Sequence, residues 1–184
     1  AGLDDGLVLH LTMTLGEDRA LPARVGPSGR GTMPPVLQDG ALLCGVPAAE
    51  VVVEDTAALD LTDALTLSAW VAPGRDISSY RSLLYKGQRA GPDAQRVHYN
   101  LCLIDGRVEF KFHDAGGHWQ GILRNAEHLL VPGGEPVLLA DIPAVQPGRW
   151  NHVAATFDHG EVRTFLDGKP VLAGVGGGRR RRRR

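Results

Sequence analysis

The 184-residue chain is 43% hydrophobic and 22% charged, which is ordinary for one globular domain with a sizeable core. Arg179–Arg184 supply six of the 20 basic residues, so the rest of the chain has 14 Lys and Arg against 21 Asp and Glu and carries a charge of −7. This acidic body disfavours nucleic acid as a specific partner, because phosphate binding depends on clustered Lys and Arg. No apolar run approaches the roughly 20 residues that span a membrane.

Strand patterns dominate the first half of the chain. Residues 6–13 alternate Leu7, Leu9, Leu11 and Met13 with more polar side chains, and residues 51–53 form a short β-branched run. Residues 65–71 alternate again and stop at Pro73-Gly74. Apolar residues that recur every second position are typical of strands buried on one face.

The second half predicts two hairpin regions. Residues 99–113 contain two alternating runs joined at Asp105-Gly106, a strong hairpin signal. Residues 150–172 repeat this pattern, with turns near Asp158–Gly160 and at Asp167-Gly168. No long segment has a 3.6-residue apolar period, so we predict an all-β fold, either a sandwich or a barrel.

Three segments are predicted to be connections, where function often lies: the Gly- and Pro-rich segment 16–40, the segment 74–96 with one strand-like piece at residues 81–87, and the long segment 124–146. We expect a single domain over residues 1–175. Residues 176–184 combine glycines with the arginine run, which is typical of a flexible linker and a tag, or of a disordered tail. Such a tail would bind polyanions without sequence preference.

Six of these segments, taken in order over most of residues 6–173, resemble a laminin-G-like domain of the concanavalin-A-like jelly-roll superfamily. The most specific are Leu65–Trp70 and Trp150–Asp158, the latter followed by a Leu-Asp-Gly hairpin. The resemblance implies an antiparallel two-sheet jelly-roll sandwich. Because large apolar side chains on alternating strands usually face inward, we expect the space between the sheets to be filled by four aromatic residues: Trp70, Trp150, Phe157 and Phe165.

Two features depart from this family. Cys44 stands where related domains have a phenylalanine-like core residue, and the chain stops soon after residue 174, where related domains continue with strands that close the sheet. Unless another segment or subunit fills that gap, residues 6–13 form an exposed apolar edge, which predicts a truncated domain or oligomerisation through the open edge. Cys44 is predicted to point into the core and Cys102 away from it, so we expect two free thiols.

Strand alternation also predicts a candidate binding face. If Tyr99, Leu101 and Leu103 face the core, the side chains between them face outward, as do alternate side chains on the strand after Asp105-Gly106. Planar hydrogen-bonding groups beside an aromatic ring are typical of sugar-binding sites. The candidate ligand-binding residues are His98, Asn100, Glu109, Lys111, His113, Trp119 and Gln120. Tyr80, Arg81, Lys86 and Arg89 would rim this face, although any solvated sheet face is polar as well.

No catalytic residue is predicted. Glucanases of this superfamily use a strand with alternating acidic residues, and neither Glu54-Asp55 nor Glu109 supplies that alternation. No cofactor is predicted either. Calcium is the alternative that the resemblance implies, because related domains often hold it with loop carboxylates, and His113, Asp114 and His118 lie close together in the sequence.

We therefore predict a non-catalytic, lectin-like module that binds carbohydrate or mediates adhesion. The alternative is a protein-interaction domain whose open sheet edge is completed by a partner or a second subunit, and a glycoside-active enzyme is the third option. The resemblance implies an extracellular or cell-surface location, although the first residues of the chain show no signal-peptide pattern.

Overall fold

A computed structural model of the chain divides it into two compact units, Ala1–Asp60 and Leu61–Arg184. Within the described residues the regular structure consists of strands and two short 3-10 turns, without an α-helix. The structure describes residues 10–11, 20–21, 23–25, 29–31, 37–38, 41–42, 51–60, 63–87, 97–114, 117–125 and 127–175.

The described part of the first unit consists of short antiparallel strands and the turn η1 (Ala57–Leu59). They pair as β1 (His10–Leu11) with β3 (Ala23–Val25), β4 (Gly29–Gly31) with both β2 (Ala20–Leu21) and β7 (Val51–Val53), and β5 (Leu37–Gln38) with β6 (Ala41–Leu42). The β-branched run at residues 51–53 is thus confirmed as a strand. The rest of the predicted strand 6–13, and Cys44, lie outside the described residues.

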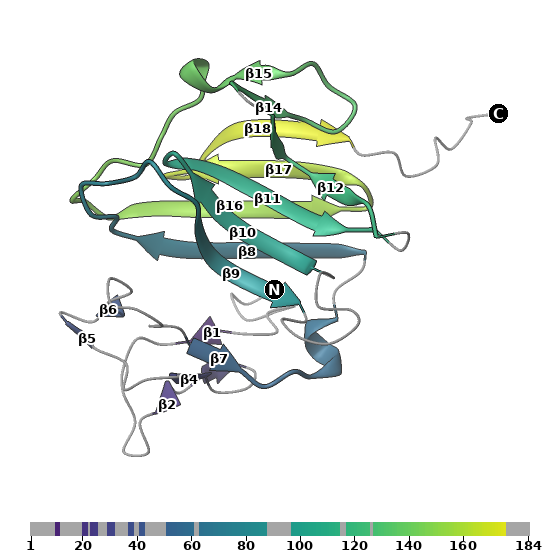
Figure 1. Cartoon of the computed structure of the whole chain (residues 1–184). Helices are drawn as coiled ribbons and strands as arrows, with labels where there is room; N and C mark the ends of the chain where they lie inside the picture. The colour runs from purple at the N-terminus through teal and green to yellow at the C-terminus, as the bar shows by residue number, and fades with distance from the viewer. Residues whose placement is uncertain are drawn as a thin grey trace. The chain divides into compact units, whose positions relative to one another are not determined.

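The second unit is built on two four-stranded antiparallel sheets, one in front of the other in Figure 1. The front sheet, in the order β12-β11-β10-β9, consists of β9 (Arg81–Gly87), β10 (Val97–Ile104), β11 (Arg107–His113) and β12 (Trp119–Gly121). The back sheet, in the order β18-β17-β16-β8, consists of β8 (Ala64–Val71), β16 (Asn151–Asp158), β17 (Glu161–Leu166) and β18 (Lys169–Val175).

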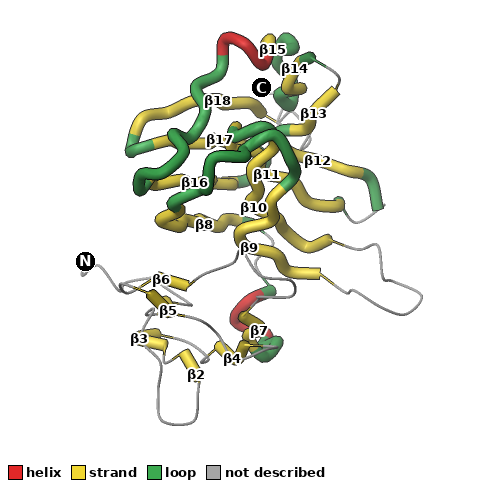
Figure 2. Tube along the Cα trace, turned by 60° about the vertical axis from the view of Figure 1, so that its left-hand side comes forward, coloured by secondary structure: helices red, strands yellow, loops and turns green. Residues whose placement is uncertain are grey.

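The predicted loop 124–146 contains regular structure. A small antiparallel sheet and a turn occupy much of it, with the bounds β13 (Leu123–Asn125), β14 (His128–Leu130), β15 (Val137–Leu138) and η2 (Leu139–Asp141). Figure 2 shows these strands beyond the β12 edge of the front sheet.

One apolar core lies between the front and back sheets. The front sheet contributes Leu101 and Phe110, both fully buried, and the back sheet contributes Val153 and Val162. Each such side chain stabilises the fold by about 1.5–3 kcal/mol through the apolar area it removes from water. The prediction of an antiparallel two-sheet sandwich is confirmed.

The three predicted hairpins are also confirmed. β10 and β11 are joined by Asp105-Gly106, β16 and β17 by His159-Gly160, and β17 and β18 by Asp167-Gly168. Both residues of every turn have positive φ, from 46° to 97°. Two-residue turns of this kind match the right-handed twist of the strands, and they favour Asp or Asn before Gly because these residues tolerate positive φ.

The prediction for the four aromatic residues is mostly wrong. Phe157 does pack between the sheets, with its ring centroid 5.0 Å from that of Phe112 on β11. Trp70 and Trp150, by contrast, are 66% and 50% exposed. Trp70 lies on the outer face of β8, because Ala69 and Val71 on either side of it pack against the core.

Phe165 likewise lies on the outer face of the back sheet. Its strand neighbours Thr164 and Leu166 are buried in the core side of β17, while Phe165 is half-buried and pairs with Ala154. Apart from Phe157, the inner face of the back sheet is filled by smaller aliphatic side chains. The core between the sheets is therefore packed without the tryptophans.

Candidate functional site: the Lys111 face

Lys111 on β11 is the centre of the predicted binding face. Its ammonium nitrogen Nζ lies 4.8 Å from the ring centroid of Tyr80 and 5.6 Å from that of Trp119. These rings are 46% and 45% exposed. Within the described part of the chain Lys111 forms no ion pair. The two rings therefore position the ammonium group, with about 0.5–1 kcal/mol for an exposed cation–π contact, without neutralising its charge.

Strand β12 brings Trp119 to this face. The register pairs Gly121 with Lys111 and Trp119 with His113, and the indole and imidazole centroids are 3.9 Å apart. The imidazole is oriented in turn, because its Nδ1 accepts a hydrogen bond of 3.0 Å from the backbone N–H of Val97. We call the set of Tyr80, Lys111, His113 and Trp119 the Lys111 face.

Asn100, on β10, holds the Tyr80 ring in place by a hydrogen bond. Its amide Nδ2 donates a hydrogen bond of 2.5 Å to the Tyr80 hydroxyl, and its Oδ1 accepts one of 3.0 Å from Ser82. Alternation predicts Asn100 on the solvated face, but the residue is 2% exposed, so its predicted exposure is wrong. The asparagine instead fixes the phenol ring that flanks Lys111.

Glu109 and Cys102 lie deeper on the same face. Both are fully buried, although alternation predicts them to be in solvent. Neither carboxyl oxygen of Glu109 has a hydrogen-bond partner in the described structure. Burial raises the pKa of Glu109 to about 7, partly offset by the positive charge of Lys111. Burial also raises the pKa of the Cys102 thiol to about 12.

The two remaining predicted residues are His98 on β10 and Gln120 on β12. His98 is exposed at an irregularity in the pairing of β10 with β9, between Val97 and Tyr99. Gln120 pairs with Phe112, whose ring packs on the core, so Gln120 alternates to the side opposite Trp119. Its amide donates to Asp114 with a distance of 3.0 Å.

Tyr80, which the sequence suggested only as a rim residue, is thus central to the site. It precedes β9 and reaches over the sheet, and no strand periodicity marks it. Its position depends on a hydrogen bond to Asn100, 20 residues along the chain.

Asp114 and the aspartates at the three hairpin turns have protein partners. Asp105 forms an ion pair with Arg124, Asp158 with His159 and Asp167 with Arg149. Asp114 accepts hydrogen bonds from the backbone N–H of His118 and from Gln120. In the part of the chain that the structure describes, no three His, Cys, Asp or Glu residues form a group that could hold a metal ion.

Comparisons with known proteins agree with this architecture. A laminin G-like family described as the concanavalin A-like lectin/glucanases superfamily matches residues 47–182. No curated protein matches the chain.

No helix among the described residues is long and apolar enough to cross a membrane.

Similar solved structures include binding domains of botulinum neurotoxin serotype D. The ligand-binding domain in complex with N-acetylneuraminic acid is 11% identical with a TM-score of 0.59, over 92% of this chain and 39% of that chain. The receptor-binding domain is 12% identical with a TM-score of 0.58, over 92% and 41%. Domains LG4-5 of the mouse laminin alpha1 chain are 18% identical with a TM-score of 0.41, over 65% and 25%. This chain thus spans about two fifths of the toxin domains, and at these identities the likeness shows the fold alone.

Proposed function

We propose that this chain, which belongs to the concanavalin A-like lectin/glucanase superfamily, is a non-catalytic module that binds acidic carbohydrate at the Lys111 face. The observation that carries the proposal is an ammonium group without an ion pair in the described structure, held between two half-exposed aromatic rings. The family and its fold place the protein among lectin-like domains; the ligand class is inferred from the side chains.

The charge of the site favours an anionic sugar. Because Lys111 forms no ion pair within the described ranges, its ammonium group can pair with a carboxylate or sulfate group of a ligand. A hydrogen bond to a charged group contributes about 1.5–3 kcal/mol. The charge of Lys111 acts on Glu109, whose pKa of about 7 makes it largely neutral in mildly acidic solution. The indole of Trp119 offers an apolar surface for the C–H side of a sugar ring.

The lack of a second carboxylate beside Glu109 on β11 supports a binding role rather than glycoside hydrolysis. Glycosidases place two carboxyl groups about 5–10 Å apart across the scissile bond. On β11 the positions two residues to either side of Glu109 are Arg107 and Lys111, so this strand presents one carboxyl group among basic side chains. We also propose that the chain acts outside the cell, as part of a larger secreted or surface protein; its family supports this location.

Isothermal titration of the full chain with short uronate-containing, sulfated and neutral oligosaccharides, at physiological salt, tests this function. We expect the acidic ligands to bind, Lys111→Met to weaken them about 10–100-fold and Trp119→Ala about 3–10-fold, without a change in melting temperature. Lys169→Met, on the other sheet, is the control for loss of one positive charge, and the arginine tail is common to all variants.

Equal affinities for Lys111→Met and Lys169→Met would exclude the Lys111 face as the site. If no saccharide binds and a protein partner does, with an affinity that depends on Lys111, the chain is a protein-interaction domain instead.

A further inference from the structure

The outer side of the back sheet has a second cluster of exposed aromatic side chains. An open hollow of about 440 Å³ is lined by Trp70, Arg149, Trp150, His152, Asp167 and Gly168. Trp70 and Trp150 are its most exposed apolar groups, at 66% and 50%. The ring of His152 lies beside Trp70 with a centroid distance of 5.1 Å. We call this feature the tryptophan hollow.

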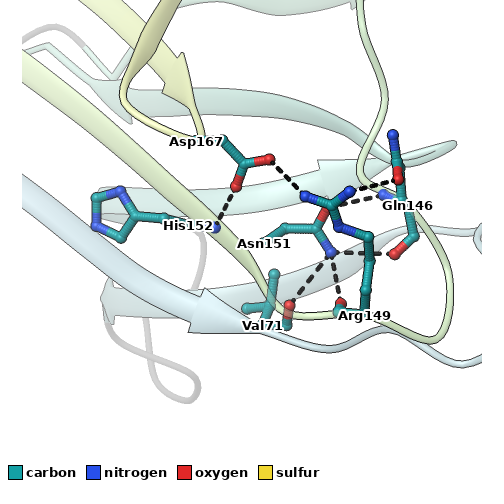
Figure 3. Close-up of polar contacts among 6 residues, drawn as sticks. All are labelled: Val71, Gln146, Arg149, Asn151, His152 and Asp167. Atoms are coloured by element: carbon teal, nitrogen blue, oxygen red, sulfur yellow. Dashed lines mark hydrogen bonds and ion pairs between the residues drawn. The ribbon is translucent and has the colours of Figure 1, made fainter.

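The buried side chain of Asn151 holds the loop that carries Arg149 and Trp150, in addition to a backbone hydrogen bond from Gly148 to Pro73. The Oδ1 of Asn151 accepts a hydrogen bond of 2.8 Å from the backbone N–H of Gln146. Its Nδ2 donates to the carbonyl oxygens of Arg149 and Gln146, at 2.7 and 3.0 Å, and lies 3.4 Å from that of Val71 (Figure 3). Because Asn151 is 1% exposed, these bonds are shielded from water, and the loop is fixed before any ligand arrives.

Asp167, in the turn between β17 and β18, is hydrogen-bonded to β16, the strand that carries Asn151 and His152. Its Oδ1 accepts a hydrogen bond of 2.9 Å from the backbone N–H of His152, and its own N–H donates to the His152 carbonyl at 2.7 Å. Its Oδ2 lies 3.6 Å from Nη2 of Arg149, whose Nη1 donates to Gln146 Oε1 at 2.8 Å (Figure 3). The acidic and basic groups of the hollow therefore neutralise each other.

This charge balance distinguishes the tryptophan hollow from the Lys111 face. A paired guanidinium and carboxylate attract neither an anion nor a cation strongly, but both retain hydrogen-bonding capacity: a guanidinium has five N–H donors and a carboxylate about four acceptor sites. The two indoles add apolar surface. Planar polar groups next to aromatic faces suit a ring with hydroxyl groups on its edge and C–H groups on its side.

We propose that the tryptophan hollow is a second ligand site, which binds a neutral saccharide through stacking on Trp70 and Trp150 and hydrogen bonds to Arg149 and Asp167. It lies on the outer side of the sheet opposite the one that carries the Lys111 face. The proposal does not depend on acidic carbohydrate binding at that face.

The three tryptophans allow each site to be observed separately. Trp119 reports on the Lys111 face, and Trp70 and Trp150 report on the tryptophan hollow. The full chain labelled with 5-fluorotryptophan should give three ¹⁹F NMR signals, assigned from single Trp→Phe variants. The exposure of all three indoles leaves room for the fluorine atom.

Titration with neutral glucose-, galactose-, mannose- and N-acetylglucosamine-containing oligosaccharides should shift the Trp70 and Trp150 signals together and leave Trp119 in place. Trp150→Ala and Arg149→Met should each weaken this binding at least about 3-fold, whereas Trp119→Ala should not change it. Acidic oligosaccharides should shift Trp119, so failure of one site leaves the other measurable.

The proposal is overturned if no neutral oligosaccharide moves the Trp70 or Trp150 signal at millimolar concentration. It is also overturned if these signals respond only to a protein partner, because exposed tryptophan and arginine are common in protein-binding hot spots as well.

Discussion

Glu109 and Cys102 lie directly opposite each other on β11 and β10, and neither side chain is exposed to solvent. They occupy the outer side of the front sheet, next to Lys111, rather than the apolar core between the sheets. A carboxyl group at such a position costs free energy when it ionises, because the charge has lost its water and has no hydrogen-bond donor in the described structure. The site therefore holds one group that opposes folding at high pH.

We expect Glu109→Gln to stabilise the protein above neutral pH. The pKa of Glu109 rises from 4.5, its ordinary value, to about 7 in the folded protein. The folded state then binds the proton more tightly than the unfolded state. The stability that this proton contributes is therefore complete below pH 4.5 and is lost as the pH rises to 7. This loss is on the order of 3 kcal/mol. Urea denaturation between pH 5 and 9 should show the wild type losing stability and Glu109→Gln changing much less.

Glu135→Gln is the matched control for this experiment. Glu135 is exposed, so its substitution should leave the pH dependence of the wild type intact. The free energies of unfolding of the wild type and of Glu109→Gln could instead run parallel over this pH range. The carboxyl group would then ionise without cost, which contradicts its burial without a hydrogen-bond donor.

The front sheet shows what strand alternation predicts and what it does not. Tyr99, Leu101 and Leu103 face the core as expected, so the direction of every intervening side chain follows from the sequence. Whether such a side chain reaches water depends on what covers the sheet, as Tyr80 covers Asn100. That contact joins residues distant in sequence, so no local pattern indicates it.

For the tryptophans, side-chain size is a poor predictor of burial. The alternation of Leu65, Leu67, Ala69 and Val71 already directs Trp70 to the opposite face of β8, yet its size favours the core. In this protein the two-residue period of the strand predicts the direction of Trp70 better than the size of its side chain does. Trp150 precedes β16 in the loop fixed by Asn151, where periodicity predicts nothing, so no sequence pattern indicates the tryptophan hollow.

Gly121 should be irreplaceable at the end of β12. Its φ is +104°, and a Cβ atom there would lie 2.3 Å from the Phe110 carbonyl oxygen and 3.0 Å from the Lys111 Cα. Gly121→Ala should therefore lower the free energy of unfolding by at least about 2 kcal/mol and displace Trp119, which lies on the same short strand. Urea denaturation and titration with an acidic oligosaccharide measure the two effects.

Gly74→Ala provides the comparison. Apart from its chain neighbours, no atom of the described residues lies within 4 Å of the position that its Cβ would take, so the variant should unfold at nearly the wild-type urea concentration. Equal stability of Gly121→Ala and Gly74→Ala would show that β12 does not approach β11 as closely as the structure has it.

The last prediction concerns the asparagine that holds the tryptophan hollow. Asn151→Ala removes the side-chain partner of the Gln146 N–H and of the Gln146 and Arg149 carbonyl oxygens, and it should cost about 2 kcal/mol of stability. Gln146→Ala keeps those bonds, because Asn151 is hydrogen-bonded to the backbone of Gln146. It loses only the bond from Arg149 to an exposed side chain and should cost much less. In ¹⁹F spectra Asn151→Ala should broaden or move the Trp150 signal, while Trp119, on the other sheet, stays unchanged. A Trp150 signal that is unaffected by Asn151→Ala, together with wild-type stability, would mean that the loop is held by other contacts.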